Sequence, residues 1–176
     1  MKTLGHKSFA SFLFVALNVM RWTLWAVLGL LVLVGIPAYI IDSKIDLEWV
    51  TTPPPGVVLW PSLILAVIAI LVGLLVISRL RLIFLTLIDG DPFVPQNAVH
   101  LRVVWVTLAV WEVLRMVFSS GTFLALSASG QDPNVSGLRG ELNINAGLWL
   151  AVAVLIVLAE VFREGARLRA EHKLTI

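Results

Sequence analysis

Cysteine is absent from the 176-residue chain, and charged residues make up only 14% of it. The lack of cysteine excludes disulfide bonds, thiolate metal sites, covalent haem attachment, iron–sulfur clusters and a cysteine nucleophile. A typical soluble domain carries about 25% charged residues, so the low charge content is unusual. Apolar residues reach 59% and form long runs between a few groups of charges. These properties indicate an integral membrane protein.

The sequence also lacks the catalytic signatures that can be recognised from residue spacing. It has no G-x-S-x-G, H-E-x-x-H, Walker loop or dinucleotide fingerprint. Its three histidines have no paired spacing that would suggest a metal site, and Asp89-Gly90-Asp91 is too short for a calcium loop. We therefore expect no enzyme activity, no metal and no cofactor. The basic residues flank apolar runs, so the expected partner is the lipid bilayer with its anionic headgroups, not nucleic acid.

Four apolar runs are long enough to cross a bilayer, which takes about 20 residues in a helix. The predicted spans are residues 22–41, 57–77, 103–126 and 144–161. The sequence allows the first helix to extend back to Phe9 and the second to continue to Ile88. We therefore predict an all-α fold, in which residues 1–176 form a single integral membrane four-helix transmembrane bundle.

The segments between the spans carry turn signals. Asp89–Asn97 contains a glycine and two prolines, which predicts a tight loop within the polar segment 78–102. Ala69 and Gly73 are small residues four positions apart, a spacing that allows a neighbouring helix to approach closely. The charged stretch after the fourth span predicts that its helix continues into a tail, residues 162–176.

The distribution of lysine and arginine predicts the orientation. Two, Lys44 and Arg139, fall on one side of the membrane, and Arg115 lies inside the third span. Ten fall on the other side: Lys2, Lys7, Arg21, Arg79, Arg81, Arg102, Arg163, Arg167, Arg169 and Lys173. Cytoplasmic segments carry an excess of these residues. We therefore expect a multi-pass protein of the cell's plasma membrane with both termini in the cytoplasm.

Glu112 and Arg115 are the most informative polar residues, because both lie deep in the third predicted span. Each charge costs about 2.5 to 3.5 kcal/mol at the centre of a membrane helix on the insertion scale. A spacing of three places the two side chains on one helical face, so we expect them to contact each other and to face the bundle interior. The pair is either a structural element that fixes packing or part of an ion or proton relay.

The end of the fourth helix alternates acidic and basic residues. Glu160 and Arg163, and Glu164 and Arg167, have the i,i+3 spacing of helical ion pairs. This pattern fits a solvated helix end, and it also fits a docking surface for a cytoplasmic protein. We expect the Asp89–Asn97 loop to lie beside the start of this helix extension, with Phe93 and Phe162 on the same side of the bundle.

Two segments resemble one known family. Asp89-Gly90-Asp91-Pro92-Phe93, with Asn97, is similar to its cytoplasmic loop, and the stretch from Leu158 to Ile176 resembles its C-terminal signature. The family is the group of bacterial four-helix membrane proteins called domain of unknown function 2975. The resemblance implies no activity and no catalytic residues. It does imply a neighbouring helix-turn-helix regulator, because such regulators are often encoded beside family members.

The sequence favours a non-enzymatic membrane protein that acts through protein contacts, with a helix-turn-helix regulator as the implied cytoplasmic partner. Two alternatives stay open: a small ion-coupled transporter that uses the Glu112–Arg115 pair, and an accessory subunit of a larger membrane complex. The candidate docking residues on the cytoplasmic side are Asp89, Asp91, Phe93, Asn97, Glu160, Phe162, Arg163 and Arg167.

Overall fold

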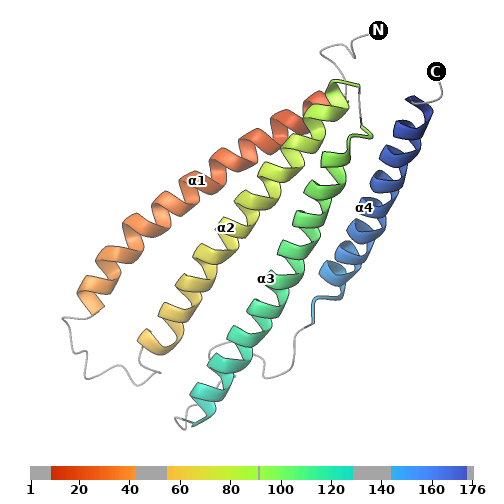
Figure 1. Cartoon of the computed structure of the whole chain (residues 1–176). Helices are drawn as coiled ribbons and strands as arrows, with labels where there is room; N and C mark the ends of the chain where they lie inside the picture. The colour runs from red at the N-terminus through yellow and green to blue at the C-terminus, as the bar shows by residue number, and fades with distance from the viewer. Residues whose placement is uncertain (1–8, 43–54, 91, 129–143, 174–176) are drawn as a thin grey trace.

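The computed structural model describes residues 9–42, 55–90, 92–128 and 144–173, and all regular structure in these ranges is α-helical (Figure 1). The helices are α1 (Phe9–Asp42), α2 (Pro55–Ile88), α3 (Pro95–Ala128) and α4 (Ala146–Lys173). The predicted all-α fold of four helices is therefore confirmed. Both optional extensions are present, because α1 begins at Phe9 and α2 continues to Ile88.

Three of the helices are long and apolar enough to cross a membrane. The qualifying segments are Phe12–Pro37, Pro61–Ile88 and Ala146–Glu171, with mean hydropathies of 2.0, 2.8 and 2.1. The remaining helix, α3, carries Glu112 and Arg115. It is not among the three qualifying helices, and it runs antiparallel to α2 and packs against it. Large apolar side chains are exposed on all four helices, as expected of surfaces that face lipid.

The helices pack in chain order. Among the described residues, extensive contacts join α1 with α2, α2 with α3, and α3 with α4. Figure 1 shows the corresponding arrangement, with each helix antiparallel to the next. As a consequence, α4 depends on α3 for its position.

Small and apolar residues bring α1 and α2 together. A Cβ added at Gly73 would lie 3.2 Å from Leu24 Cδ1, so the glycine permits the close approach that its spacing from Ala69 predicted. Leu17 of α1 and Ile77 of α2 are buried nearby. We call this contact surface, from Phe14 to Leu24 on α1 and from Gly73 to Arg81 on α2, the α1–α2 seam.

A short turn joins α2 to α3. Gly90 has a φ of +78°, a left-handed conformation that glycine adopts without strain. The predicted loop ended at Asn97, but α3 begins at Pro95, because proline is favoured in a first helical turn. Asn97 is fully buried there, and its Nδ2 donates hydrogen bonds to Thr86 Oγ1 (2.6 Å) and to Pro92 O (2.8 Å). This side chain ties the end of α2, the turn and α3 together.

Helix α4 is shifted along the axis of the molecule relative to its neighbours. Its first turn lies beside Glu112, which is midway along the 34-residue α3, and Figure 1 shows α4 starting well above the lower end of α3. The far part of α4 lies beside the α2–α3 turn, where Phe162 contacts Phe93. The predicted span 144–161 therefore does not run alongside the whole of span 103–126. We call the end of the molecule with the α2–α3 turn the turn end.

Candidate functional site

A buried ion pair lies at the centre of α3. Arg115 Nε donates to Glu112 Oε2 at 2.9 Å, and Arg115 Nη2 donates to Glu112 Oε1 at 2.6 Å. The Glu112 side chain has no exposed surface, whereas that of Arg115 is 28% exposed. Two parallel hydrogen bonds between guanidinium and carboxylate are the strongest form of this interaction. The expected contact between the two residues is confirmed.

The same carboxylate reaches the start of α4. The backbone N–H of Asn145 donates to Glu112 Oε1 at 3.2 Å, across 33 positions of the sequence. The Asn145 side chain caps the helix, because its Oδ1 accepts a hydrogen bond from the backbone N–H of Leu148 at 3.1 Å. The Ala146 N–H donates to Ile144 O at 3.0 Å. Glu112 therefore connects α3 to the amino terminus of α4.

The amino terminus of α4 needs hydrogen-bond acceptors from the protein because it lies beside the middle of α3. At 1.5 Å per residue α3 is about 50 Å long, and the hydrocarbon core is about 30 Å thick. Any layer of that thickness that lies within the length of α3 includes the middle of the helix. The first four N–H groups of a helix have no partner within it, and none can come from lipid. The Glu112 carboxylate accepts from one N–H of this end, and its negative charge suits the positive end of the helix dipole.

Asn145 is the member of this site that the sequence analysis missed. An asparagine before an apolar run is a typical helix-capping signal, and this signal marks the start of α4. Nothing in the sequence connects Asn145 to Glu112, because the contact depends on the shift of α4 along α3. The pairing of Glu112 with Arg115 could be predicted, since three residues of helix determine their separation.

A second cluster forms at the turn end. The rings of Phe93 and Phe162 lie 5.8 Å apart with an interplanar angle of 39°, so the expected proximity of the loop and the helix extension is confirmed. A Cβ added at Gly165 would lie 2.6 Å from Phe93 Cδ1 and 2.9 Å from its Cε1. The Phe93 ring therefore occupies the space that any side chain at position 165 would need. We call Phe93, Phe162 and Gly165 the aromatic lock.

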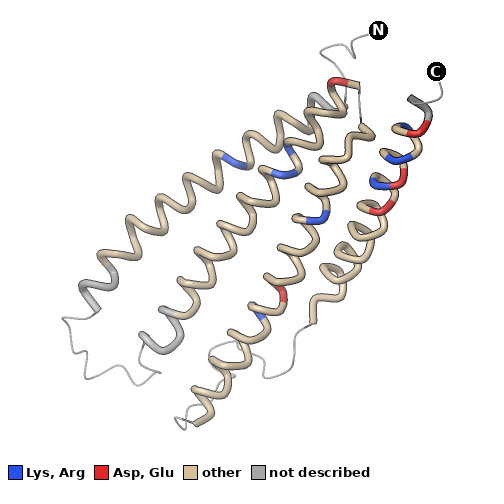
Figure 2. Tube along the Cα trace, in the orientation of Figure 1, with Lys and Arg blue, Asp and Glu red and all other residues tan. Residues whose placement is uncertain are grey.

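The charges of α4 beyond the aromatic lock pair along the helix. Arg163 pairs with Glu160. Arg167 lies 3.2 Å from Glu164 and 3.3 Å from Glu171. All of these side chains are largely exposed, so the pairs contribute little to stability, and Figure 2 shows the charges gathered along this part of α4. They give the turn end a surface of mixed charge.

The structure places the candidate docking residues in three different ways. Asp89 is exposed and Phe93 is 42% exposed, so both are accessible at the turn. Asn97 is fully buried and acts within the turn, which makes a direct contact with a partner impossible. Asp91 lies outside the described residues. The remaining candidates are on α4: Glu160, Phe162, Arg163 and Arg167.

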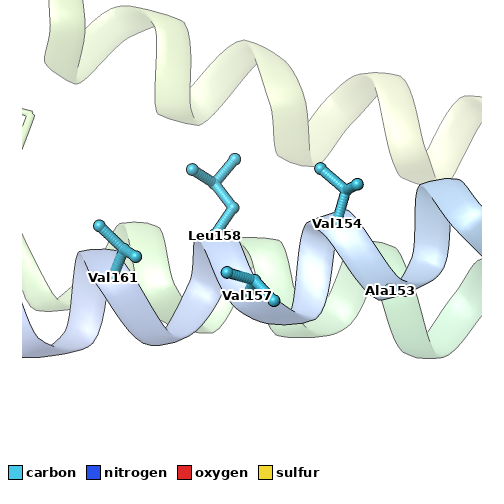
Figure 3. A pocket seen from close by; sticks show the side chains of 5 residues that line it. All are labelled: Ala153, Val154, Val157, Leu158 and Val161. Atoms are coloured by element: carbon cyan, nitrogen blue, oxygen red, sulfur yellow. The ribbon is translucent and has the colours of Figure 1, made fainter.

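An apolar groove of 360 Å³ runs along α4 between the two clusters. Figure 3 shows Val154 and Leu158 pointing away from the α4 backbone on the same side of the helix. The lining residues are Ala153, Val154, Val157, Leu158 and Val161. None of these side chains has a polar or titratable group, so the groove offers no means of recognising an ion or of moving a proton.

Comparison with known proteins identifies the family. The model of the family described as protein of unknown function (DUF2975) matches residues 18–176. The chain belongs to the DUF2975 family. The match includes the buried pair, Asn145 and the aromatic lock, so all of these features lie within the DUF2975 region. No curated protein and no solved structure matches the chain.

Removing the charge of Glu112 should destabilise the protein. Glu112→Gln removes the buried carboxylate that pairs with the Arg115 guanidinium, and breaking a buried pair in this way costs roughly 3 to 5 kcal/mol. We expect a lower apparent melting temperature in detergent. The double variant Glu112→Gln/Arg115→Met removes both charges and should recover much of the loss. The control is Glu160→Gln, which breaks an exposed pair and should change stability by about 1 kcal/mol or less. Normal stability of Glu112→Gln would contradict a structural pair.

The aromatic lock predicts that Gly165→Ala has opposite effects on stability in the presence and in the absence of the Phe93 ring. In an otherwise unchanged chain, Gly165→Ala should lower the melting temperature, because the methyl group displaces the Phe93 ring and weakens an aromatic contact worth about 0.5 to 1.5 kcal/mol. With Phe93→Ala the space is open, and the same substitution should stabilise the helix by up to about 1 kcal/mol.

Gly121 in α3 provides the control, because a Cβ there would meet nothing within 4 Å. Gly121→Ala should therefore be neutral or stabilising whether residue 93 is phenylalanine or alanine. If Gly165→Ala has the same effect in both backgrounds, Phe93 does not occupy the space above Gly165.

Proposed function

We propose that this protein acts without catalysis, by presenting a docking surface to a cytoplasmic protein at the turn end. The observation that carries the proposal is the aromatic lock, which joins the α2–α3 turn to α4. Two segments that are far apart in the sequence thereby contribute to one surface. The assignment of the turn end to the cytoplasm rests on the excess of lysine and arginine in the segments at that end.

The chemistry of the surface supports recognition of a folded protein. Exposed charges of both signs lie on α4, and the half-exposed Phe93 ring packs against Phe162 of the same helix. Aromatic side chains and arginine are enriched at protein interfaces, whereas a surface for nucleic acid would be uniformly basic. The proposed partner is a helix-turn-helix regulator, as the family resemblance implies. Holding such a regulator at the membrane would keep it away from DNA.

Ion coupling through Glu112 and Arg115 is the second candidate. It is favoured by one observation, namely a charged pair in the middle of a helix whose other central residues are mainly apolar. However, both carboxylate oxygens already have partners, and the Glu112 side chain is enclosed. These contacts favour a structural role for the pair. A role as accessory subunit of a larger membrane complex would instead use the exposed apolar faces of the helices.

Co-purification tests the docking proposal. A tagged protein is extracted from native membranes in mild detergent, and the proteins that co-purify are identified. We expect a DNA-binding regulator, which the variant Arg163→Glu/Arg167→Glu should lose. Leu150→Ala, which alters an exposed apolar side chain on the same helix, should retain it. Recovery of large membrane subunits would support the accessory role instead, and a regulator that both variants retain would rule out α4 as the docking surface.

The proposed orientation has a separate test. Reporter fusions after Ile176 should show the cytoplasmic phenotype, and fusions at Lys44 and Arg139 should show the periplasmic one. The physical reason is the ten-to-two distribution of basic residues across the predicted spans. A periplasmic carboxyl terminus would place the turn end outside the cell, where no transcription regulator could reach it.

A further inference from the structure

Two arginines lie in the α1–α2 seam without a carboxylate. Arg81 Cζ lies 5.1 Å from the centre of the Phe14 ring across the seam. Arg21 is two helical turns from Phe14 on the same face of α1, and its Cζ lies 5.8 Å from the ring centre of Trp22. Between these arginines the seam is closed by Leu17 and Ile77, both buried. Both arginines thus lie along the stretch where α1 packs against α2.

The described residues provide no counter-charge for this pair. Neither α1 nor α2 contains an acidic residue, apart from Asp42 at the far end of α1. Within the described ranges, the ion pairs lie inside α3 and inside α4. The Nε atoms of Arg21 and Arg81 are buried and have no hydrogen-bond partner in the structure. An anion from outside the protein would supply the acceptor that these buried donors lack and would stabilise the seam.

The position of the two arginines along their helices indicates which kind of anion would bind there. Arg21 directly precedes the apolar run 22–41, and Arg81 follows the run 57–77, so both side chains lie where the hydrocarbon meets the headgroups at the turn end. The basic positions of α1 and α2 also lie at similar heights in Figure 2. Phosphate oxygens of lipids lie at this level. A guanidinium can hold a phosphate with two parallel hydrogen bonds, and the ring contacts restrict its orientation in advance.

We infer that Arg21 and Arg81 form a binding site for the headgroup of an acidic phospholipid at the α1–α2 seam. The headgroup phosphate lies between the two guanidiniums, and the acyl chains extend along the exposed apolar surface of α1. The site would neutralise the seam and hold α1 against the rest of the molecule, since in the described part of the chain α1 packs extensively on α2 alone. It does not depend on the identity of a cytoplasmic partner.

The test measures lipid binding to the full-length protein in detergent by native mass spectrometry. The probes are phosphatidylglycerol and phosphatidylcholine with identical acyl chains. We expect the wild type to bind phosphatidylglycerol at least about tenfold more tightly, since each basic residue near the surface contributes about 1 kcal/mol. Arg21→Gln/Arg81→Gln should lower the affinity for phosphatidylglycerol about tenfold or more and leave phosphatidylcholine binding unchanged.

The matched control is Arg163→Gln/Arg167→Gln, which removes the same charge from α4, and it should bind phosphatidylglycerol as the wild type does. Equal losses in the two double variants would overturn the proposal, because net charge would then explain the binding. Competition by inorganic phosphate that displaces the lipid completely would also overturn it, since the site would then take a free anion.

A second pair of substitutions keeps the test valid if the glutamine variant does not fold. Arg21→Lys/Arg81→Lys retains both charges but loses the planar two-pronged donor and its packing on the rings. We expect phosphatidylglycerol affinity between those of the wild type and the glutamine variant. Affinity equal to that of the wild type would show that the guanidinium geometry plays no part and would overturn the assigned site.

Discussion

The start of helix α4 depends on the carboxylate of Glu112 as a hydrogen-bond acceptor. Helix α4 begins beside the middle of α3, and its first N–H groups have no acceptors within the helix itself. Glu112 accepts a hydrogen bond from Asn145 and two from Arg115, so one side chain closes the helix end and neutralises the arginine. The free-energy cost of burying the carboxylate is offset only because all of these contacts form together.

This arrangement attaches α4 to the rest of the molecule at two points. The inner point is Glu112, and the outer point is the aromatic lock, in which Gly165 lets the Phe93 ring lie against α4. Among the described residues, α4 has extensive contacts with α3 alone, so these two points and the packing between them determine its position. The surface that we propose for docking is therefore positioned in part by a buried ion pair that the docking partner does not touch.

Local features of this fold could be predicted from the sequence. Long apolar runs identify the four helices, because crossing hydrocarbon requires about 20 apolar residues in a row. The contact of Glu112 with Arg115 follows from helical geometry, and the Phe93–Phe162 contact follows from placing both segments at one end of the molecule. Each of these predictions depends only on the geometry within one helix, or on the rule that successive helices cross the membrane in opposite directions.

Features that depend on the register between helices could not be predicted. Helical periodicity says nothing about how far α4 slides along α3, so the partnership of Asn145 with Glu112 was missed. The same reason applies to Gly165, whose importance depends on which ring lies above it. The sequence predicts Asn97 in a tight loop and as a docking candidate, but Pro95 starts α3 early and places Asn97 inside, between Thr86 and Pro92.

The depth of α4 in the membrane tests this account most directly. The chain lacks cysteine, so single cysteines can carry nitroxide labels at two exposed positions, Val110 of α3 and Leu150 of α4. Paramagnetic relaxation by oxygen and by a water-soluble nickel chelate then reports the depth of each label in lipid vesicles. The account predicts that both labels lie at similar depth in the hydrocarbon interior, because α4 begins beside the middle of α3. A label at Leu150 close to the membrane surface, with the Val110 label deep, would contradict it.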